Sequence, residues 1–395
     1  IEYSHYGPIL LREGNKAYAV ACPYLDQVDF VTSMYLQTKA RNLKEFREAM
    51  ALNQWMYQNI MYGDVDGNIY YLRTGRVPIR PEGYDFMRPV PGNTSASEWL
   101  GIHPMDDLLQ ILNPADGYMQ NCNCDPAVMT MHPAVNPEAY PYYIYNSTPG
   151  GYHERGWRAR HLLDSTTNMT LDQAVAVAFD TYVDWSDEYQ RALAEAAKAW
   201  ADDPRIRYVQ EPLKLIGAWN GRLEVESVGA TLFDRWADKP EVNALRGAIL
   251  KGENLTREQQ GQMLLALYEA SESLREQFGR LDVQWGDIHR VRRGEQSWPG
   301  AGGDFVLRSF GWGQPDANGI TYGTHGQSAT TLVFFKPGHV ESYSLTPLGQ
   351  SDDPNSSYYD DQARHLYARK QLKPTLFYRE DLMPYITSTK TLTMP

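Results

Sequence analysis

The sequence lacks several features that would assign it to a common class. No stretch of about 18 consecutive apolar residues occurs, so no membrane-spanning helix is predicted. The three cysteines are too few for a disulfide scaffold, and their odd number leaves at least one unpaired within the chain. There is no run of Lys and Arg, and the net charge of −12 argues against a nucleic-acid partner. A G-x-S-x-G elbow, an H-E-x-x-H motif, a P-loop and a Rossmann glycine fingerprint are all missing.

Two short motifs suggest metal sites but fit them poorly. Cys122 and Cys124 form C-x-C with only Asp125 beside them and no cluster of His nearby, so we do not predict a metal site there. The D-x-D-G segment at 64–67 begins like a calcium-binding loop, but Gly75 stands where such a loop needs Glu. We therefore interpret 64–67 as a hairpin turn.

The first third of the chain indicates strands around one helix. Residues 1–35 alternate short apolar and polar runs, notably 7–11 and 17–21, as in an antiparallel sheet. Asn42 is placed to cap a helix with an apolar stripe at Leu43, Phe46, Ala49 and Met50. Residues 59–63 and 68–72 then flank Asp66-Gly67, the dipeptide of a tight turn, which predicts a hairpin.

The middle of the chain changes character twice. From 76 to 150 it is rich in Pro, Gly, Asn and Tyr without periodicity, which predicts a long irregular segment of functional use. From 170 to about 279 it is helical, beginning with a capping box at 170–173 and including windows 187–200 and 257–278.

Strands return after Trp285. A turn is predicted at 316–319 and an apolar strand at 331–335. The fold class is therefore α+β, and we expect the first and last strands to share a sheet. The predicted division is 1–165 for the sheet and irregular active-site segment, 166–282 for a helical subdomain, and 283–395 for returning strands and a C-terminal helix.

Two polar clusters are candidate sites. Asn121 and Asn123 flank Cys122 in the irregular segment, and an Asn held on a loop can donate its side-chain N–H to a developing oxyanion. The alternative is that these residues only cap turns. Arg155, Arg158 and Arg160, with His153 and His161, open a predicted helix and could orient polar groups or bind a carboxylate. Their alternative is a solvated helix face.

The 27 Tyr and 10 Trp could line a ligand groove, even one for carbohydrate, but they also suit a core or subunit interface. Many of these rings fall inside motifs that resemble the β chain of the penicillin and cephalosporin acylases. The motifs are N-I-M-Y-G-D-V-D-G-N-I-Y-Y-L-R-T-G from Asn59, R-P-V-P-G at 88–92, W-L-G-I-H-P-M-D-D-L from Trp99, N-P-A-D-G-Y-M-Q-N-C-N at 113–123 and G-Q-S-D-D-P-N-S-S-Y-Y-D-D-Q from Gly349. The segment S-H-Y-G-P-I-L at 4–10 also resembles that chain.

The resemblance implies an N-terminal nucleophile hydrolase with an αββα sandwich, here partial and with an inserted helical layer. Such enzymes mature by autocatalytic cleavage of a precursor, and the first residue of the β chain, a Ser, attacks the amide carbonyl. The α-amino group of that Ser serves as base, since its pKa near 8 suits proton transfer near neutral pH. Because Ile1 has no nucleophilic side chain, we expect the Ser on another chain or segment of the precursor.

The resemblance also assigns residues. Asn123 matches the Asn that completes the oxyanion hole, and Arg155 matches the Arg that orients it, with Asn121 behind them. Gln327 stands where cephalosporin acylases carry a Glu that assists a catalytic His. Since Gln cannot carry that charge, a penicillin-acylase-like mechanism without the carboxylate is favoured.

The predicted function is hydrolysis of an N-acyl amide, with β-lactams, acyl-homoserine lactones and acylated lipopeptides as candidate substrates. The expected partners are the α chain and the nucleophile-bearing segment of the same precursor. The resemblance implies a periplasmic or secreted location and no catalytic cofactor, and it allows a structural calcium ion. The rival hypothesis, motivated by the missing Ser, is a catalytically inactive structural or ligand-binding relative.

Overall fold

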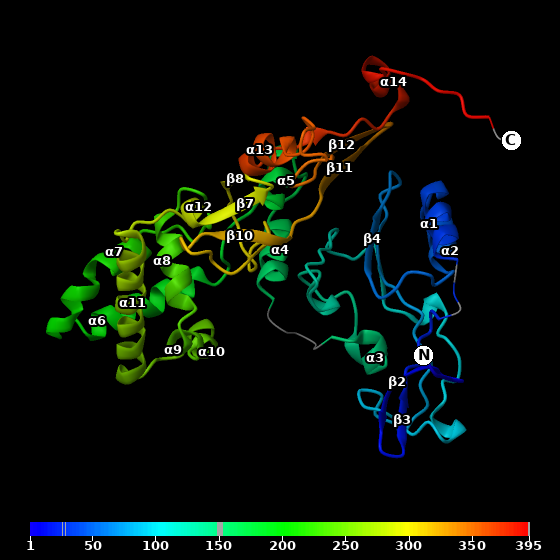
Figure 1. The fold of residues 1–395 in the computed structure, drawn as a ribbon, viewed down its shortest axis with the longest axis horizontal. Coiled ribbons are helices and arrows are strands. Elements are labelled where there is room, and N and C mark those ends of the chain that lie inside the picture. The colour runs from blue at the N-terminus through cyan, green and yellow to red at the C-terminus, as the bar shows by residue number, and fades with distance from the viewer. Residues whose placement is uncertain (26, 28, 148–152, 394–395) are drawn as a thin grey trace. The chain divides into compact units, whose positions relative to one another are not determined.

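The chain folds into two compact units, Ile1–Gly151 and Tyr152–Pro395, in a computed structural model that describes residues 1–25, 27, 29–147 and 153–393 (Figure 1). Each hydrogen-bonded sheet lies within one unit. Residues Ile1–Gly151 form unit 1, and residues Tyr152–Pro395 form unit 2.

Unit 1 begins with a small antiparallel sheet followed by two helices. The sheet contains β1 (Tyr3–Ser4), β2 (Gly7–Glu13) and β3 (Lys16–Ala19), and the helices are α1 (Phe30–Lys39) and α2 (Leu43–Met50). The predicted Asn42 cap is confirmed, because its side chain accepts a hydrogen bond from the Glu45 N–H at 2.9 Å. On the predicted stripe, Ala49 and Met50 are buried.

The strand prediction for 1–35 is right for β2 and β3 but wrong for α1. This helix buries the polar Ser33, whose hydroxyl donates to the Ala49 carbonyl at 3.1 Å. Val31 and Tyr35 are 74% and 58% exposed. With its apolar side chains turned outward, the helix carries no buried apolar stripe that a pattern could detect.

The predicted hairpin is confirmed as β4 (Asn59–Gly63) and β5 (Ile69–Arg73), which pair antiparallel and are joined by β6 (Gln110–Leu112). Gly67 has φ +86°, and its N–H donates to the Asp64 carbonyl at 3.2 Å. The Asp64 side chain accepts from the N–H groups of Asp66 and Asn68 at 3.0 and 2.9 Å. These bonds confirm the interpretation of 64–67 as a turn.

The irregular segment follows β5 as predicted, with short helical turns over it. They are η1 (Ser95–Ser97), η2 (Met105–Asp107), η3 (Pro126–Val128), η4 (Pro137–Ala139) and α3 (Tyr142–Tyr145). Its residues pack on β5 and β6 in a buried cluster of Tyr71, Leu109, Ile111, Cys124, Val128, Met129 and Tyr145. The segment is thus anchored to the sheet at several points.

Unit 2 begins with a helical run. Its members are α4 (Glu154–Asp164), α5 (Leu171–Ala178), α6 (Ser186–Ala199), η5 (Pro204–Val209), α7 (Gln210–Gly217), α8 (Val228–Ala237), α9 (Pro240–Asn243), α10 (Arg246–Leu250), α11 (Arg257–Phe278) and α12 (Trp285–Ile288). The predicted windows 187–200 and 257–278 correspond to α6 and α11. The predicted capping box is present, since Thr170 and Gln173 exchange side-chain to backbone hydrogen bonds at 3.3 and 2.9 Å.

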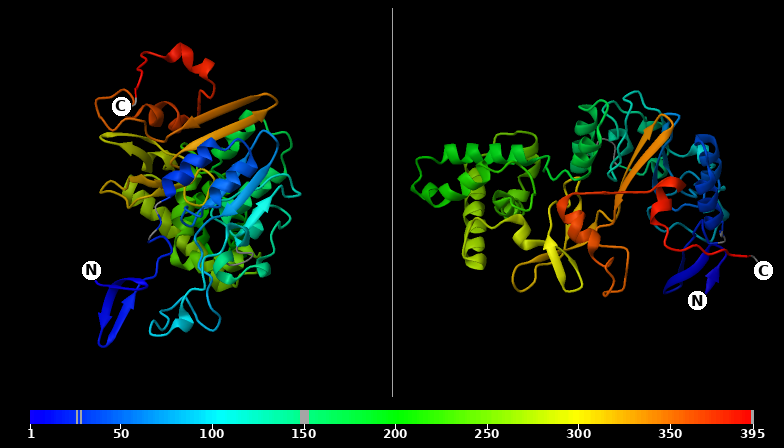
Figure 2. Two further views of the ribbon diagram at one scale, coloured as in Figure 1. Left: turned by 90° about the vertical axis from the view of Figure 1, so that its right-hand side faces the viewer. Right: turned by 90° about the horizontal axis from the view of Figure 1, so that it is seen from above.

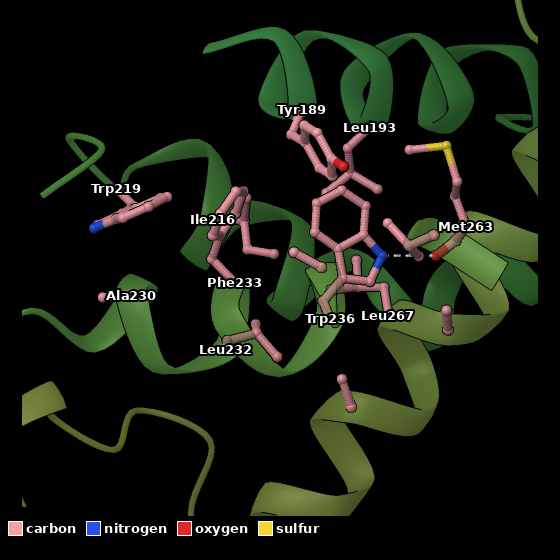
Figure 3. Close-up of a cluster of buried hydrophobic side chains, with 14 of the residues drawn as sticks. Tyr189, Leu193, Ile216, Trp219, Ala230, Leu232, Phe233, Trp236, Met263 and Leu267 are labelled. Carbon is pink, nitrogen blue, oxygen red and sulfur yellow. Dashed lines mark hydrogen bonds between the residues drawn. The ribbon is translucent and has the colours of Figure 1, made fainter. Parts of the chain in front are cut away.

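The main core of unit 2 lies among these helices. Helix α11 packs on α6 and α8 (Figure 2). Trp236 is fully buried there, and its indole N–H donates to the Met263 carbonyl at 3.0 Å (Figure 3). Around it lie Tyr189, Leu193, Phe233 and Leu267 (Figure 3).

The strands of unit 2 form two sheets. One has the order β8-β7-β10-β9 and comprises β7 (His289–Arg293), β8 (Gln296–Pro299), β9 (Phe310–Trp312) and β10 (Thr321–Gly326). The other has the order β11-β12-β13 and comprises β11 (Thr330–Lys336), β12 (His339–Leu345) and β13 (Lys373–Pro374). The predicted turn at 316–319 is confirmed, because Gly319 has φ +79° and its N–H donates to the Asp316 carbonyl at 2.9 Å. The predicted strand at 331–335 is also confirmed, because it lies within β11.

The C-terminal part adds short helical elements, namely α13 (Asp361–His365), η6 (Tyr367–Arg369), α14 (Arg379–Leu382) and η7 (Met383–Tyr385). The mixed helix and strand content agrees with the predicted class. The described strand pairings lie within unit 1 or within unit 2, and the sheet shared by the first and last strands stays a prediction. It rests on the order of elements along the chain, which does not determine connectivity.

Candidate functional site

Asn123 lies at the exposed apex of a tight turn in unit 1. Its φ of +62° places it in the left-handed region, which Asn tolerates better than other non-glycine residues. All residues from Cys124 to Thr130 are buried, whereas Asn123 is exposed. The turn therefore presents the Asn123 amide at the surface, while the residues that follow it in the chain are held in the interior.

Asn121 closes this turn. Its side-chain oxygen accepts a hydrogen bond from the Asn123 backbone N–H at 3.1 Å, in the manner of an Asx turn. Its side-chain nitrogen lies 3.6 Å from the Met129 sulfur. Asn121 thus acts on the backbone of Asn123, and its own side chain is held against a buried residue.

Gln120 fixes the N-terminal side of the turn. It is 5% exposed, and its amide nitrogen donates to the Val128 carbonyl at 3.1 Å and to the Cys124 sulfur at 3.3 Å. The backbone N–H of Gln120 donates to the Met129 carbonyl at 3.0 Å. Both ends of the turn are therefore tied to the same buried segment.

Asp125 fixes the C-terminal side. Its carboxylate accepts from the Ala127 N–H at 3.2 Å, capping η3, and from the Tyr145 hydroxyl. Burial, together with the bond to Asp125, raises the pKa of Tyr145 and keeps the phenol a donor. Since Asp125 is engaged in these bonds, it contributes to the loop's rigidity.

A rigid turn with an exposed side-chain amide suits the stabilisation of developing negative charge. A side-chain amide can donate two N–H bonds, and a donor held rigidly where negative charge develops needs no reorganisation during reaction. The alternative that these Asn residues only cap turns applies to Asn121, which does so. Asn123 instead occupies the capped position.

Arg155 lies in the first turn of α4 in unit 2. The helix is capped by His153, whose Nδ1 accepts from the Gly156 N–H at 3.2 Å. Burial, and to a smaller extent the charge of Arg155, lowers the pKa of His153 and favours the neutral, accepting imidazole. Glu154 is held by an ion pair with Arg246. The half-buried Arg155 is therefore carried by a firmly anchored helix end.

The other two arginines of the predicted basic cluster have structural contacts. The Arg158 Nε donates to the Asp180 carboxylate at 2.6 Å, and its side chain is 18% exposed. Arg160 is 7% exposed, with its guanidinium 4.2 Å from the Trp157 ring centre. The interpretation of this cluster as a solvated face is thus wrong for both residues.

Gln327 follows β10 in unit 2. Its side-chain nitrogen donates to the Ala178 carbonyl at 3.3 Å, and its backbone N–H donates to the Ser309 carbonyl at 2.9 Å. The nearby His325 is 72% exposed, and its Nε2 lies 3.9 Å from the Asp304 carboxylate. Gln327 therefore anchors its loop, and the carboxylate beside His325 comes from a different segment.

Asp180 is a residue that the sequence did not single out. It is 4% exposed and accepts from both Arg158 and Arg222 at 2.6 Å. These partners lie 22 and 42 residues away along the chain, so no local motif signals them. Asp180 joins α4 to the segment before α8, which makes it a structural centre of unit 2.

The described residues contain no group of three or more His, Cys, Asp or Glu side chains placed to hold a metal ion. The structural calcium ion that the resemblance allows stays a prediction, and no step is assigned to it. No helix among the described residues is both long enough and apolar enough to cross a membrane.

Comparison with known proteins gives a consistent result. A family model described as penicillin amidase matches residues 1–383. Penicillin G acylase of Escherichia coli is 34% identical over 138 residues, which are 35% of this chain and 15% of that protein. Penicillin acylase 2 proenzyme of Pseudomonas sp. (strain SE83) is 27% identical over 176 residues, which are 45% of this chain and 20% of that protein.

A solved structure has a similar fold. The thermostable penicillin G acylase from Alcaligenes faecalis matches with a TM-score of 0.65 and 20% identity, covering 100% of this chain and 78% of that one. The matched segments thus span only a fifth or less of the two relatives compared by sequence.

Proposed function

This chain belongs to the penicillin amidase family, and from that premise we propose that it supplies the oxyanion-binding part of an enzyme that hydrolyses the amide bond of an N-acylated small molecule. The observation that carries the proposal is Asn123, an exposed amide on a turn pinned by Asn121 and by buried residues. The similarity to bacterial penicillin acylases supports the reaction class.

The reaction proceeds in two halves. A Ser hydroxyl attacks the amide carbonyl, forming a C–O bond, and its proton passes to the α-amino group of the same Ser. The carbonyl oxygen becomes an oxyanion that accepts the Asn123 side-chain N–H. Collapse breaks the C–N bond, and the proton leaves with the amine. Water then attacks the acyl-enzyme in the same way and releases the carboxylic acid.

We place the Ser on another chain or segment of the same precursor. Two features support this: the relatives extend well beyond the matched segments, and one of them is named a proenzyme. The α chain would be a further partner from the same precursor.

Arg155 is assigned the role of orienting Asn123 and the α-amino group. The assignment comes from the family resemblance, and it is supported by the anchoring of α4 and by the engagement of Arg158 with Asp180. Arg155 is thus proposed as a positioning residue.

Gln327 is proposed to lie outside the chemical steps. Its amide anchors the loop after β10 through Ala178. Because the α-amino group serves as base, the mechanism needs no carboxylate at this position.

The wider features of the family are extended to this chain as proposals. They are the αββα sandwich with an inserted helical layer, the division at 165 and 282, autocatalytic processing, and a periplasmic or secreted location. The substrate is proposed to be an N-acyl amine such as a β-lactam, an acyl-homoserine lactone or a lipopeptide.

The test is deacylation by the assembled enzyme with Asn123→Gly. Glycine adopts φ +62° without strain, so this variant removes the amide donor while preserving the turn. We expect kcat to fall by about a hundredfold or more, as for loss of one oxyanion donor.

Asn168→Gly is the matched control, because Asn168 is also exposed and has φ +51°. It should leave kcat unchanged. Asn123→Asp, which replaces the donor by a negative charge, should be at least as impaired as Asn123→Gly. Wild-type turnover in Asn123→Gly would refute the assignment.

A further inference from the structure

Arg73 is a buried cation in unit 1 that the proposed chemistry does not use. It is the last residue of β5 and is 6% exposed. Among the described residues it has no ion-pair partner, and its Nε is buried without a hydrogen-bond partner. Taking a guanidinium out of water is unfavourable unless its other contacts compensate. The role of Arg73 must therefore be sought in the groups that it does contact.

Those groups lie at the C-terminal end of α3. The Arg73 Nη1 donates to the Tyr145 carbonyl and, at 3.0 Å, to the Ser147 hydroxyl. Helix α3 is a single turn that ends before Asn146 at φ +44°, so its last carbonyls have no partner within the helix. A helix of one turn is not stable by itself. Arg73 thus caps α3 and ties its end to β5.

Tyr145 connects the end of α3 to the turn that presents Asn123. The Tyr145 hydroxyl donates to the Asp125 carboxylate, which also accepts from the Ala127 N–H at 3.2 Å. Both Tyr145 and Asp125 are buried. Asp125 follows Asn123 by only two residues, so a displacement of this carboxylate would be transmitted to the turn.

Strand periodicity places these contacts on one face of the sheet. Side chains alternate along a strand, so Tyr71 and Arg73 share a face of β5 and Tyr70 lies on the other face. Tyr71 packs in the buried cluster that also contains Tyr145 and the residue after Asn123. Tyr70 belongs to a separate cluster. The face of β5 that carries Arg73 is therefore the face that supports the turn.

We propose that Arg73 and Tyr145 are positioning residues for the oxyanion donor Asn123, with Arg73 acting through Tyr145 and Asp125. The inference rests on the proposed function of Asn123. An oxyanion donor is effective only when it is held in place before the reaction, so loosening these contacts lowers turnover and leaves substrate binding unchanged. Neither Arg73 nor Tyr145 is assigned a chemical step.

The first test is Tyr145→Phe in the assembled enzyme, which removes the hydroxyl and keeps the ring in the core. Activity is measured on a panel of N-acyl 4-nitroanilides, and the anilide that the wild type cleaves fastest is used throughout. We expect kcat to fall about tenfold with KM unchanged. Arg73→Met should act in the same way, and Arg73→Lys, which keeps a cationic donor, should restore part of the loss.

Tyr70→Phe is the matched control. Tyr70 is also buried on β5, and its hydroxyl donates to the Gln110 side chain at 2.5 Å. This variant loses one buried phenol hydrogen bond on the opposite face, so it should lower the melting temperature about as much as Tyr145→Phe and leave kcat unchanged. An equal fall of kcat in both variants would reflect general destabilisation and would overturn the proposal.

A double-mutant cycle separates positioning from support of the fold. In the Asn123→Gly background, Tyr145→Phe should change kcat by less than about twofold, because the amide that it positions is absent. If Asn123→Gly alone is impaired and Tyr145→Phe has the same effect in both backgrounds, this inference fails and the proposed function stands. Wild-type turnover in Asn123→Gly would refute the proposed function and this inference with it.

Hydrogen exchange gives a readout that does not depend on activity. The Asn123 backbone N–H is bonded to the Asn121 side chain, so loosening of the turn exposes it. The segment 118–130 should exchange faster in Tyr145→Phe and Arg73→Met than in the wild type or Tyr70→Phe. Exchange over 118–130 that is the same in all four proteins would overturn the proposal.

Discussion

Asp234 on α8 is a carboxyl group that folding makes a weaker acid. Burial, reinforced by the negative charge of Asp238, raises its pKa to about 7 against the partial opposition of Arg235. Between about pH 4 and 7 the folded state therefore holds a proton that the unfolded state has lost, and the free energy of unfolding falls as pH rises through this window.

Asp234→Asn should remove this loss. We expect the variant to gain melting temperature relative to the wild type, with a larger gain at pH 8 than at pH 4. Thermal melts across this range measure the difference, and a gain independent of pH would contradict the assigned pKa.

His289 shows the opposite linkage. It is 6% exposed, is stacked 3.5 Å from the Trp285 ring centre, and has Nδ1 3.0 Å from the Trp285 carbonyl oxygen. Burial lowers its pKa to about 3 although the bond to Trp285 opposes the shift. Stability contributed by the neutral ring is complete above about pH 6.5 and is lost as pH falls towards 3.

His289→Phe keeps an aromatic ring on Trp285 but cannot take up a proton. We expect it to be less stable than the wild type at pH 7.5, because a buried hydrogen bond is lost, and to lose less stability between pH 6.5 and pH 4. Parallel pH dependence of urea midpoints for the two proteins would rule out this role.

At the scale of elements, capping chemistry sets where the long helix begins. Thr256 and Gln259 form a capping box at the start of α11, with bonds of 3.3 and 2.8 Å. This helix buries residues such as Met263, Leu267 and Leu274 in the core of unit 2. Fraying of the first turn of α11 would therefore destabilise the helical layer that packs around it.

Thr256→Ala should lower the free energy of unfolding by about 1 kcal/mol, the usual cost of a lost N-cap. Thr256→Ser retains the hydroxyl and should restore most of the loss, whereas Thr389→Ala, in the exposed C-terminal segment, should have no effect. Tryptophan fluorescence in urea reports the change, and an equal loss in the Ala and Ser variants would point away from the cap.

Elements with local signals were predictable. The Asn42 and Thr170 caps, the hairpin at 59–72 and the windows at 187–200 and 257–278 rest on short-range rules and were confirmed. Helix α1 was missed because it buries Ser33 and exposes Val31, which inverts the usual pattern. The pairing of distant strands has no local signal, so the sheet predicted to join the first and last strands stays a prediction.

For the whole molecule, the family could be predicted from motifs that occur in a fixed order along the chain, and the family match over 1–383 confirms it. For the turn around Asn123, the sequence showed only a cluster of polar residues. The left-handed φ of Asn123 and its bond to Asn121 could not be predicted, because they depend on the folded backbone. The role of Asp180 could not be predicted from the sequence, because its two arginine partners are distant along the chain.

We propose that an acyl-enzyme forms on a Ser outside these residues and that Asn123 stabilises its formation. Its most direct test is a single-turnover reaction of the assembled protein with an N-acyl substrate, quenched in acid, with intact mass and N-terminal sequence determined for every chain. We expect an acyl adduct on a chain that begins with Ser, and we expect it to form at least about a hundredfold more slowly in Asn123→Gly. An adduct on residues 1–395, or equal rates in both proteins, would contradict it.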